Sequence, residues 1–427
     1  MKTHARLPVF LMLATCFVLA PLGQVLAQEE KKECEPGAVE RKERGSLIGE
    51  RTYRRISAVH EQLGNEEYAE AKKTLEAMLK GSLNDYETAV VEQTMGYVYA
   101  GQGKYAQAVP HFERALNADA LPNAGHFGLM YSLAQLYVAL EPPQHQKSLD
   151  LVLQYLSFQC DPPAPAFMLV GQNYASMNKY REALPWVQKA IAKNGDKTPE
   201  SWYLLELAIY FETKDYDSAA SLLTSMVARW PDKIKYWEML SSAYQQQEKD
   251  KEALSVLMLA YQQGMVTEEK KILNVVRMNM FLETPFMAGS ILEREMAANR
   301  VEENQKHLEL LLGAWTAARE FDRAIQTIDR LAPYHTDGEI FVQKAQLLME
   351  KGRWSETIAA ARQAIDKGGL KKPGGAYLMI GIAANELSDW QQSMDALKEA
   401  KRYDDKTRRQ ADDWMKFVQD RIAVARG

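Results

Sequence analysis

The sequence contains few of the residues that build metal sites, disulfide frameworks or catalytic centres. It has three cysteines and seven histidines in 427 residues. No two histidines have the four-residue spacing of a zinc-binding helix, and no pair of cysteines neighbours a histidine. The Gly-x-Ser-x-Gly nucleophile turn and the Gly-Lys-Ser/Thr phosphate loop are missing as well. We therefore predict no catalytic residue, no metal site and no cofactor, and we expect no enzyme.

Long apolar runs are also missing, apart from one at the N-terminus. Two basic residues precede the apolar segment 9–22, and small residues at 25 and 27 frame a cleavage site. This order predicts a signal peptide over residues 1–27, removed after Ala27, and export to the periplasm. An uncleaved membrane anchor is the alternative. Cys16 does not predict a lipoprotein, because a threonine precedes it and the apolar run continues beyond it.

A strong charge of one sign is lacking too. Removal of the leader changes the formal net charge from −5 to about −7, since the leader holds two basic and no acidic residues. This mild acidity argues against nucleic acid and anionic membrane surfaces as main partners. Two cysteines remain, Cys34 and Cys160. An oxidising compartment permits a bridge between them, but their separation in the sequence favours two free thiols, and both alternatives stay open.

What the sequence does contain is a repeated pattern of aromatic, small and large apolar residues. One copy reads Tyr105, Ala108, Phe112 and Ala115, and similar copies begin at Tyr180, Tyr216 and Phe321. The small residue recurs at Ala183, Ala219 and Ala253, 34 to 36 residues apart. This period is typical of tetratricopeptide repeats, in which each unit is a pair of helices.

The period predicts an all-α fold, a superhelix of about ten tetratricopeptide-type helical hairpins over residues 51–403. Residues 28–50 are charged and lack a helical period, so we expect a flexible tether. Residues 404–427 carry apolar side chains on one face of a helix and are predicted to cap the stack. No segment of the mature chain is predicted to span a membrane.

Each hairpin needs small residues where its helices cross, such as Gly96 with Ala108 and Gly171 with Ala183. Three units fit less well. The first shows only its second helix clearly, and the third has an insertion at residues 142–143 that lengthens its turn. The seventh, near residues 281–292, contains a proline and lacks a clear small crossing residue.

The first helix of each unit is expected to line a concave face that binds protein partners. The predicted partner-binding residues are the first-helix side chains not used for packing: Gln93, Tyr97, Gln172, Phe211, Glu212, Gln245, Gln246, Gln346, Asn385 and Glu386. This lining is rich in amides and aromatics and nearly free of lysine and arginine. It favours an extended peptide or a partner's helix over a terminal carboxylate. Solvation without binding is the alternative for several of these residues.

Segments 49–55, 94–100, 200–203, 230–233 and 367–374 point to a more specific family. On these segments the chain resembles the periplasmic tetratricopeptide protein found with TonB energy-transduction systems of gammaproteobacteria. The resemblance implies an accessory scaffold of the TonB, ExbB and ExbD complex, which energises uptake of iron chelates or haem. The alternative is a scaffold in another envelope assembly, such as polysaccharide export or outer-membrane protein insertion.

Overall fold

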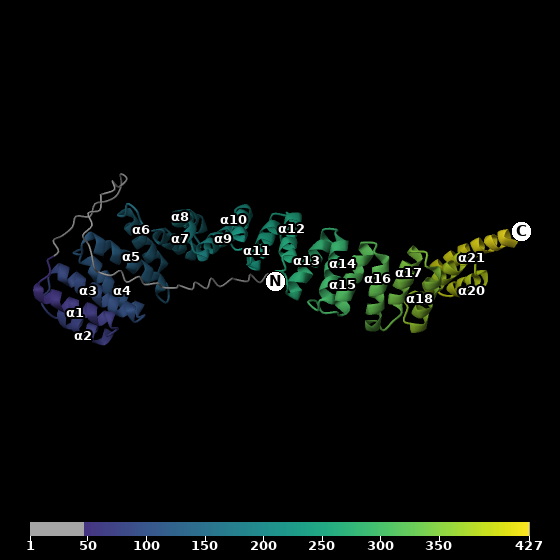
Figure 1. The fold of residues 1–427 in the computed structure, drawn as a ribbon, viewed down its shortest axis with the longest axis horizontal. Coiled ribbons are helices and arrows are strands. Elements are labelled where there is room, and N and C mark those ends of the chain that lie inside the picture. The colour runs from purple at the N-terminus through teal and green to yellow at the C-terminus, as the bar shows by residue number, and fades with distance from the viewer. Residues whose placement is uncertain (1–46, 427) are drawn as a thin grey trace. The chain divides into compact units, whose positions relative to one another are not determined.

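The computed structural model describes residues 47–426, and the regular structure of this part of the chain is entirely helical. The contacts divide the chain into unit 1, up to Trp202, and unit 2, from Tyr203 onward. Each unit is a succession of paired helices (Figure 1). The predicted all-α fold is confirmed. The predicted signal peptide and nearly all of the predicted tether lie outside the described residues.

Unit 1 consists of four helical hairpins. Their helices are α1 (Glu50–Gly64) with α2 (Tyr68–Leu79), α3 (Asp85–Gly101) with α4 (Tyr105–Asn117), α5 (Asn123–Ala139) with α6 (His145–Ser157), and α7 (Ala164–Ser176) with α8 (Tyr180–Asn194). The two helices of a pair contact each other, and α2, α4 and α6 also pack against the first helix of the next pair. The first hairpin is complete, since α1 buries Ile56 and Val59.

Unit 2 continues the same plan from α9, within which the division of the chain falls. Its helices are α9 (Glu200–Glu212) with α10 (Tyr216–Arg229), α11 (Ile234–Gln246) with α12 (Asp250–Gln262), α13 (Glu269–Phe281) with α14 (Pro285–Ala297), α15 (Gln305–Ala317) with α16 (Phe321–Leu331), α17 (Glu339–Glu350) with α18 (Trp354–Lys367), α19 (Pro373–Glu386) with α20 (Trp390–Ala400), and the single α21 (Asp405–Arg426). Helix α21 packs on α19 and α20, as the predicted cap requires. The described residues thus hold ten hairpins and a terminal helix.

A short turn inside each hairpin sets the direction of the second helix. In nine hairpins the residue two positions before the second helix has a positive φ, for example 71° at Gly103, 60° at Asn178 and 56° at Glu283. A left-handed residue at this point reverses the chain within one turn. The third hairpin differs because the segment from Ala139 to His145 is longer, which confirms the predicted insertion.

The helices of a hairpin approach closely where the sequence places glycine. A Cβ atom at Gly96 would lie 2.2 Å from the ring of Phe112, and one at Gly171 would lie 2.5 Å from Cγ2 of Val187. Gly381 has an equivalent contact in the last hairpin. The predicted crossing positions are therefore confirmed. The glycines meet large side chains one turn beyond the small residue of the second helix, so small and large residues interlock.

The seventh hairpin is more regular than its sequence indicates. Ala288 is fully buried and stands three residues into α14, where the other second helices also place their small residue. The prediction that this unit lacks a small crossing residue is therefore wrong. It failed because Pro285 stands where most of the other second helices begin with an aromatic residue. Proline is suited to this place, since it is the first residue of α14 and needs no amide donor there.

Cys160 lies between α6 and α7 and is disulfide-bonded. The expectation of two free thiols is therefore wrong for this residue. Cys34, the partner considered from the sequence, lies outside the described residues.

A buried carboxylate links successive second helices in unit 2. The side chain of Glu295 in α14 is 1% exposed, and it accepts hydrogen bonds of 2.5 Å from Tyr261 Oη of α12 and from Arg300 Nε. Burial alone would raise the pKa of Glu295. The bonds from Arg300 and Tyr261, together with the charges of Arg300 and Arg294, outweigh this effect and hold the pKa below its ordinary value.

We expect Gly171→Leu to destabilise unit 1 by about 1–3 kcal/mol, because the added side chain overpacks the crossing with Val187. Gly128→Ala in α5 is the matched control, since a Cβ there meets nothing within 4 Å. It should stabilise the helix by about 0.5–1 kcal/mol. Thermal and denaturant melting measure both changes. Equal melting of Gly171→Leu and the wild type would contradict the close crossing.

We expect Glu295→Gln to lower the free energy of unfolding of unit 2 by about 1–3 kcal/mol at neutral pH. Because the folded-state pKa is depressed, this contribution is complete above the ordinary carboxylate pKa of about 4 and is lost as the pH falls through the folded-state value. The difference from the wild type should therefore narrow towards pH ~3.

Glu293→Gln is the control for this measurement, because Glu293 is half-buried and lies 3.7 Å from Arg323 in a weaker pair. Its effect should stay within about 0.5 kcal/mol. A Glu295→Gln difference that does not change with pH would contradict the assignment.

Candidate partner-binding face

The first helices of unit 2 expose a shared set of positions, which lie four, five or eight residues before each second helix. We call these exposed residues of α11, α13, α15 and α17 the first-helix face: Gln245, Gln246, Arg277, Phe281, Gly313, Ala317, Gln346 and Glu350. Their equivalent register places them on the same side of successive hairpins.

The predicted residues of unit 1 are less accessible. Gln93 in α3 and Gln172 in α7 are half-buried. Tyr97 is 37% exposed, and its ring packs edge-on against Phe112 with 5.0 Å between centroids. Part of this aromatic side chain therefore stabilises its own hairpin. The exposed part of the predicted lining lies mainly in unit 2.

At the start of unit 2, Phe211 is half-buried at the end of α9. Its ring lies 6.0 Å from that of Tyr216, the first residue of α10. This contact closes the hairpin, so Phe211 has a packing role. The neighbouring Glu212 is exposed.

The amide residues of α11 and α17 are accessible as predicted. Gln245, Gln246 and Gln346 are all exposed. Gln245 Nε2 lies 3.6 Å from Sδ of Met278, which connects the end of α11 to α13. Their role in binding remains a prediction.

The last hairpin departs from the expected site at one of its two predicted residues. Asn385 is fully buried and donates a 2.9 Å hydrogen bond to Glu386 Oε1. Glu386 is paired with Arg421 of α21 at 3.4 Å, and that guanidinium lies 5.1 Å from the centre of the Trp390 ring. The assignment of Asn385 to an accessible face is therefore wrong, because its side chain is buried. Glu386 is exposed, as predicted.

The structure adds two residues that sequence reasoning missed. Phe281 at the end of α13 is 71% exposed, and Arg277 stands one helical turn before it. Both belong to the seventh hairpin, whose register was obscured by Pro285. Both residues precede the start of α14 by the same numbers of residues that separate the exposed positions of the other first helices from their second helices. Counting back from the start of α14 would therefore have revealed them. The face is thus less free of arginine than the sequence analysis predicted.

Small residues of α15 lie between these side chains and those of α17. A Cβ atom at Gly313 would meet nothing within 4 Å, and Ala317 is exposed one turn later. The backbone of α15 is therefore accessible beside Phe281 and Gln346. An aromatic anchor next to open backbone is an arrangement that suits the docking of a polypeptide segment.

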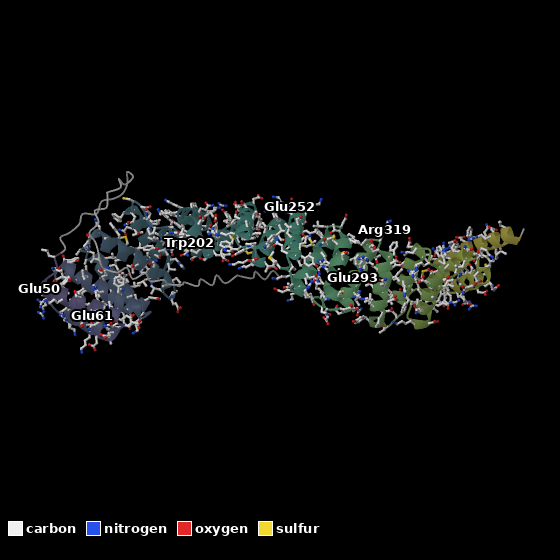
Figure 2. The ribbon with its side chains drawn as sticks, viewed as in Figure 1. Glu50, Glu61, Trp202, Glu252, Glu293 and Arg319 are labelled. Carbon is white, nitrogen blue, oxygen red and sulfur yellow. The ribbon has the colours of Figure 1, made fainter. Side chains whose placement is uncertain are left out.

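The described part of the chain can also be assessed for metal ligands, for membrane-spanning helices and for the distribution of charge. Among residues 47–426, no group of three or more His, Cys, Asp or Glu side chains could hold a metal ion. No helix within the same range is long and apolar enough to cross a membrane. Acidic and basic side chains are interspersed along both units, as the labelled Glu252, Glu293 and Arg319 illustrate in unit 2 (Figure 2).

Comparison with known proteins supports the repeat assignment. Residues 94–165 match the family model of the tetratricopeptide repeat, and this segment runs from α3 to the start of α7. No curated protein matches the chain.

Solved structures with similar folds include MamA from Desulfovibrio magneticus, with 17% identity, a TM-score of 0.36, and coverage of 44% of this chain and 99% of that one. A tetratricopeptide repeat protein from Parabacteroides merdae has 16% identity and a TM-score of 0.37 and covers 62% and 98%. YrrB, described as having an unusual peptide-binding site, has 15% identity and a TM-score of 0.34 and covers 40% and 82%. None of these similarities extends to function.

The described residues thus form a solenoid of the tetratricopeptide type, and the family match covers residues 94–165 of it. This class of fold presents extended surfaces to other proteins.

Proposed function

We propose that this chain is an exported scaffold that holds a protein partner on the first-helix face of unit 2. The observation that carries the proposal is the exposed Phe281 beside Arg277, with Gln245, Gln246 and Gln346 on the neighbouring first helices. Aromatic and arginine side chains dominate binding energy at many protein interfaces. The amides provide both donors and acceptors for the backbone of a bound segment.

The guest that fits this face is an extended peptide or an amphipathic helix. Phe281 provides apolar area, while Gly313 and Ala317 let a guest approach the backbone of α15. Arg277 on α13 and Glu350 on α17 place opposite charges at separate points of the face, which orients a guest that carries complementary charges. The first-helix face is therefore suited to a directional, mixed apolar and polar contact.

Export and assembly with an envelope machine are part of the same proposal. The order of basic, apolar and small residues in 1–27 supports secretion to the periplasm. The disulfide at Cys160 supports an oxidising compartment, where such bonds form and persist. Resemblance of segments 49–55 and 367–374 to the tetratricopeptide protein of TonB systems supports a TonB, ExbB and ExbD assembly as the partner.

Affinity capture of the tagged chain from its native envelope tests the partner and the face together. The wild type should capture TonB-type components. Combined Phe281→Ala and Arg277→Ala should reduce capture at least about tenfold, because truncated anchors often cost 2 kcal/mol or more. Gly313→Leu should also reduce capture, since its side chain would cover the open backbone of α15 without overpacking the hairpin.

The matched control for this capture is Leu259→Ala with Lys251→Ala, two exposed residues of α12 outside the first-helix face. It should capture as the wild type does, and all variants should melt like the wild type. Capture of polysaccharide-export or outer-membrane-insertion proteins would replace the TonB assignment. Equal capture by the first-helix-face variants and the control would refute the face.

Mass spectrometry of the purified native protein tests export. The N-terminal peptide should begin at Gln28, and a non-reducing digest should contain Cys160 in a disulfide. Detection of Met1 at the N-terminus, or of a free thiol at Cys160, would contradict a processed protein in an oxidising compartment.

A further inference from the structure

An acidic groove lies in unit 2 between the second helices α18 and α20, with α19 beneath them. Its volume is about 570 Å³, within the range of roughly 300–1,000 Å³ found for ligand sites. Its floor is apolar: Ile380 and Ala396 are buried, and Ile365 and Tyr377 are half-buried. Tyr377 lies on the side of α19 opposite Glu386, and Glu386 does not line the groove, so the groove is separate from the first-helix positions.

The walls of the groove are predominantly negative. The groove is lined by four carboxylates, Asp366 near the end of α18, Asp395 and Glu399 of α20, and Asp389 at the N-cap of α20. Arg362 is the one cation among the lining residues. Burial raises the pKa of Tyr377, the hydrogen bond with Tyr403 adds to it, and the negative charges of Glu399 and Asp366 act in the same direction. Carboxylates from both walls thus act on the ring at the floor.

Contacts within the protein satisfy these carboxylates only in part. Asp389 Oδ1 accepts a 3.0 Å bond from the amide of Gln392 and caps α20. Asp395 lies 3.5 Å from Lys398, and Glu399 lies 2.9 Å from Arg402. Both pairs join a carboxylate to an exposed cation three residues further along the chain, and such surface pairs contribute roughly 0–1 kcal/mol. In the described part of the chain, no ion pair involves Asp366.

The arrangement of charges selects the kind of guest. The carboxylates are spread along two helices, and none of them belongs to a group of three that could hold a metal ion in the described residues. A guest must therefore carry separated positive charges and apolar stems. Lysine and arginine side chains meet both needs, because their alkyl stems cover apolar surface while their cations reach carboxylates.

Tyr377 adds an aromatic face for such a cation. Its ring is stacked on that of Tyr403, with 5.7 Å between centroids and 20° between planes. The stack fixes the ring at the floor of the groove, where a cation can lie against it. From the apolar floor and the charge complementarity, we propose that this groove binds a lysine- or arginine-rich extended segment of a partner polypeptide.

This inference deepens the scaffold function proposed above and rests on it. It assigns unit 2 a second contact of different chemistry, on the other side of α19. The first-helix face offers aromatic and amide contacts, whereas the groove offers carboxylates and a tyrosine. One hairpin stack would then hold two polypeptide segments at once, or two parts of one partner.

A defined peptide tests the groove in solution. The probe is a fluorescein-labelled nonapeptide of alternating lysine and alanine, with the glutamate–alanine peptide as its counterpart, and the readout is fluorescence anisotropy with the full mature chain. The lysine peptide should bind and the glutamate peptide should not. Combined Asp366→Asn, Asp395→Asn and Glu399→Gln should weaken binding about tenfold or more. Asp389 is left unchanged because it caps α20.

The matched control removes the same number of charges elsewhere in unit 2, with Asp217→Asn, Glu252→Gln and Glu283→Gln at exposed positions. It should bind the lysine peptide as the wild type does. Gln391→Lys with Gln392→Lys places cations on the wall and should abolish binding without loss of melting temperature.

Equal weakening in the groove and control triples would overturn the proposal, since binding would then depend on overall charge. Failure of the wild type to bind the lysine peptide would also overturn it. Phe281→Ala with Arg277→Ala should leave peptide binding intact, so this test fails or succeeds independently of the first-helix face.

Discussion

The close crossing of the two helices within each hairpin is the constraint on which the rest of the structure depends. Where Gly96 and Gly171 stand, no side chain fits between the first helix and the Phe112 ring or the Val187 methyl group. Once two helices are held this close, their rotation about their own axes is fixed as well. That rotation decides which positions are buried and which are left for solvent or a partner. The packing of the helices within each hairpin therefore decides which side chains are available to a partner.

The same register gives each first helix two different surfaces. In α19, Tyr377 and Ile380 line an acidic groove, while Glu386 on another side pairs with Arg421 of the capping helix. In α13, the equivalent outer side carries Arg277 and Phe281 and stays open. The cap thus contacts the end of α19 through Glu386, whereas the equivalent Phe281 of α13 has its side chain open. Accessibility along the stack therefore depends on the next element of the chain as much as on a hairpin's own residues.

The sequence predicts the helices and their pairing well, because the 34-residue period directly reflects which residues must be small or large. It predicts the site less well. Pro285 takes the place of the aromatic marker, so the register of the seventh hairpin was lost, and Arg277 and Phe281 with it. Asn385 fits the exposed pattern, but its side chain is buried. The acidic groove combines Asp366 of one hairpin with Asp395 and Glu399 of the next. The spacing of residues within one hairpin does not reveal that these side chains line the same groove.

The two proposed contacts differ in the forces that would hold a guest, and this difference has a consequence for assembly. Burial of Phe281 against a partner removes apolar area from water, and this contribution changes little with ionic strength. Attraction between the groove and a basic segment is Coulombic and is screened over about 10 Å at 0.1 M salt. If both proposals hold, the groove would accelerate the encounter with a basic guest, while the first-helix face would determine how long a guest stays. A scaffold with both surfaces can retain one segment and exchange another.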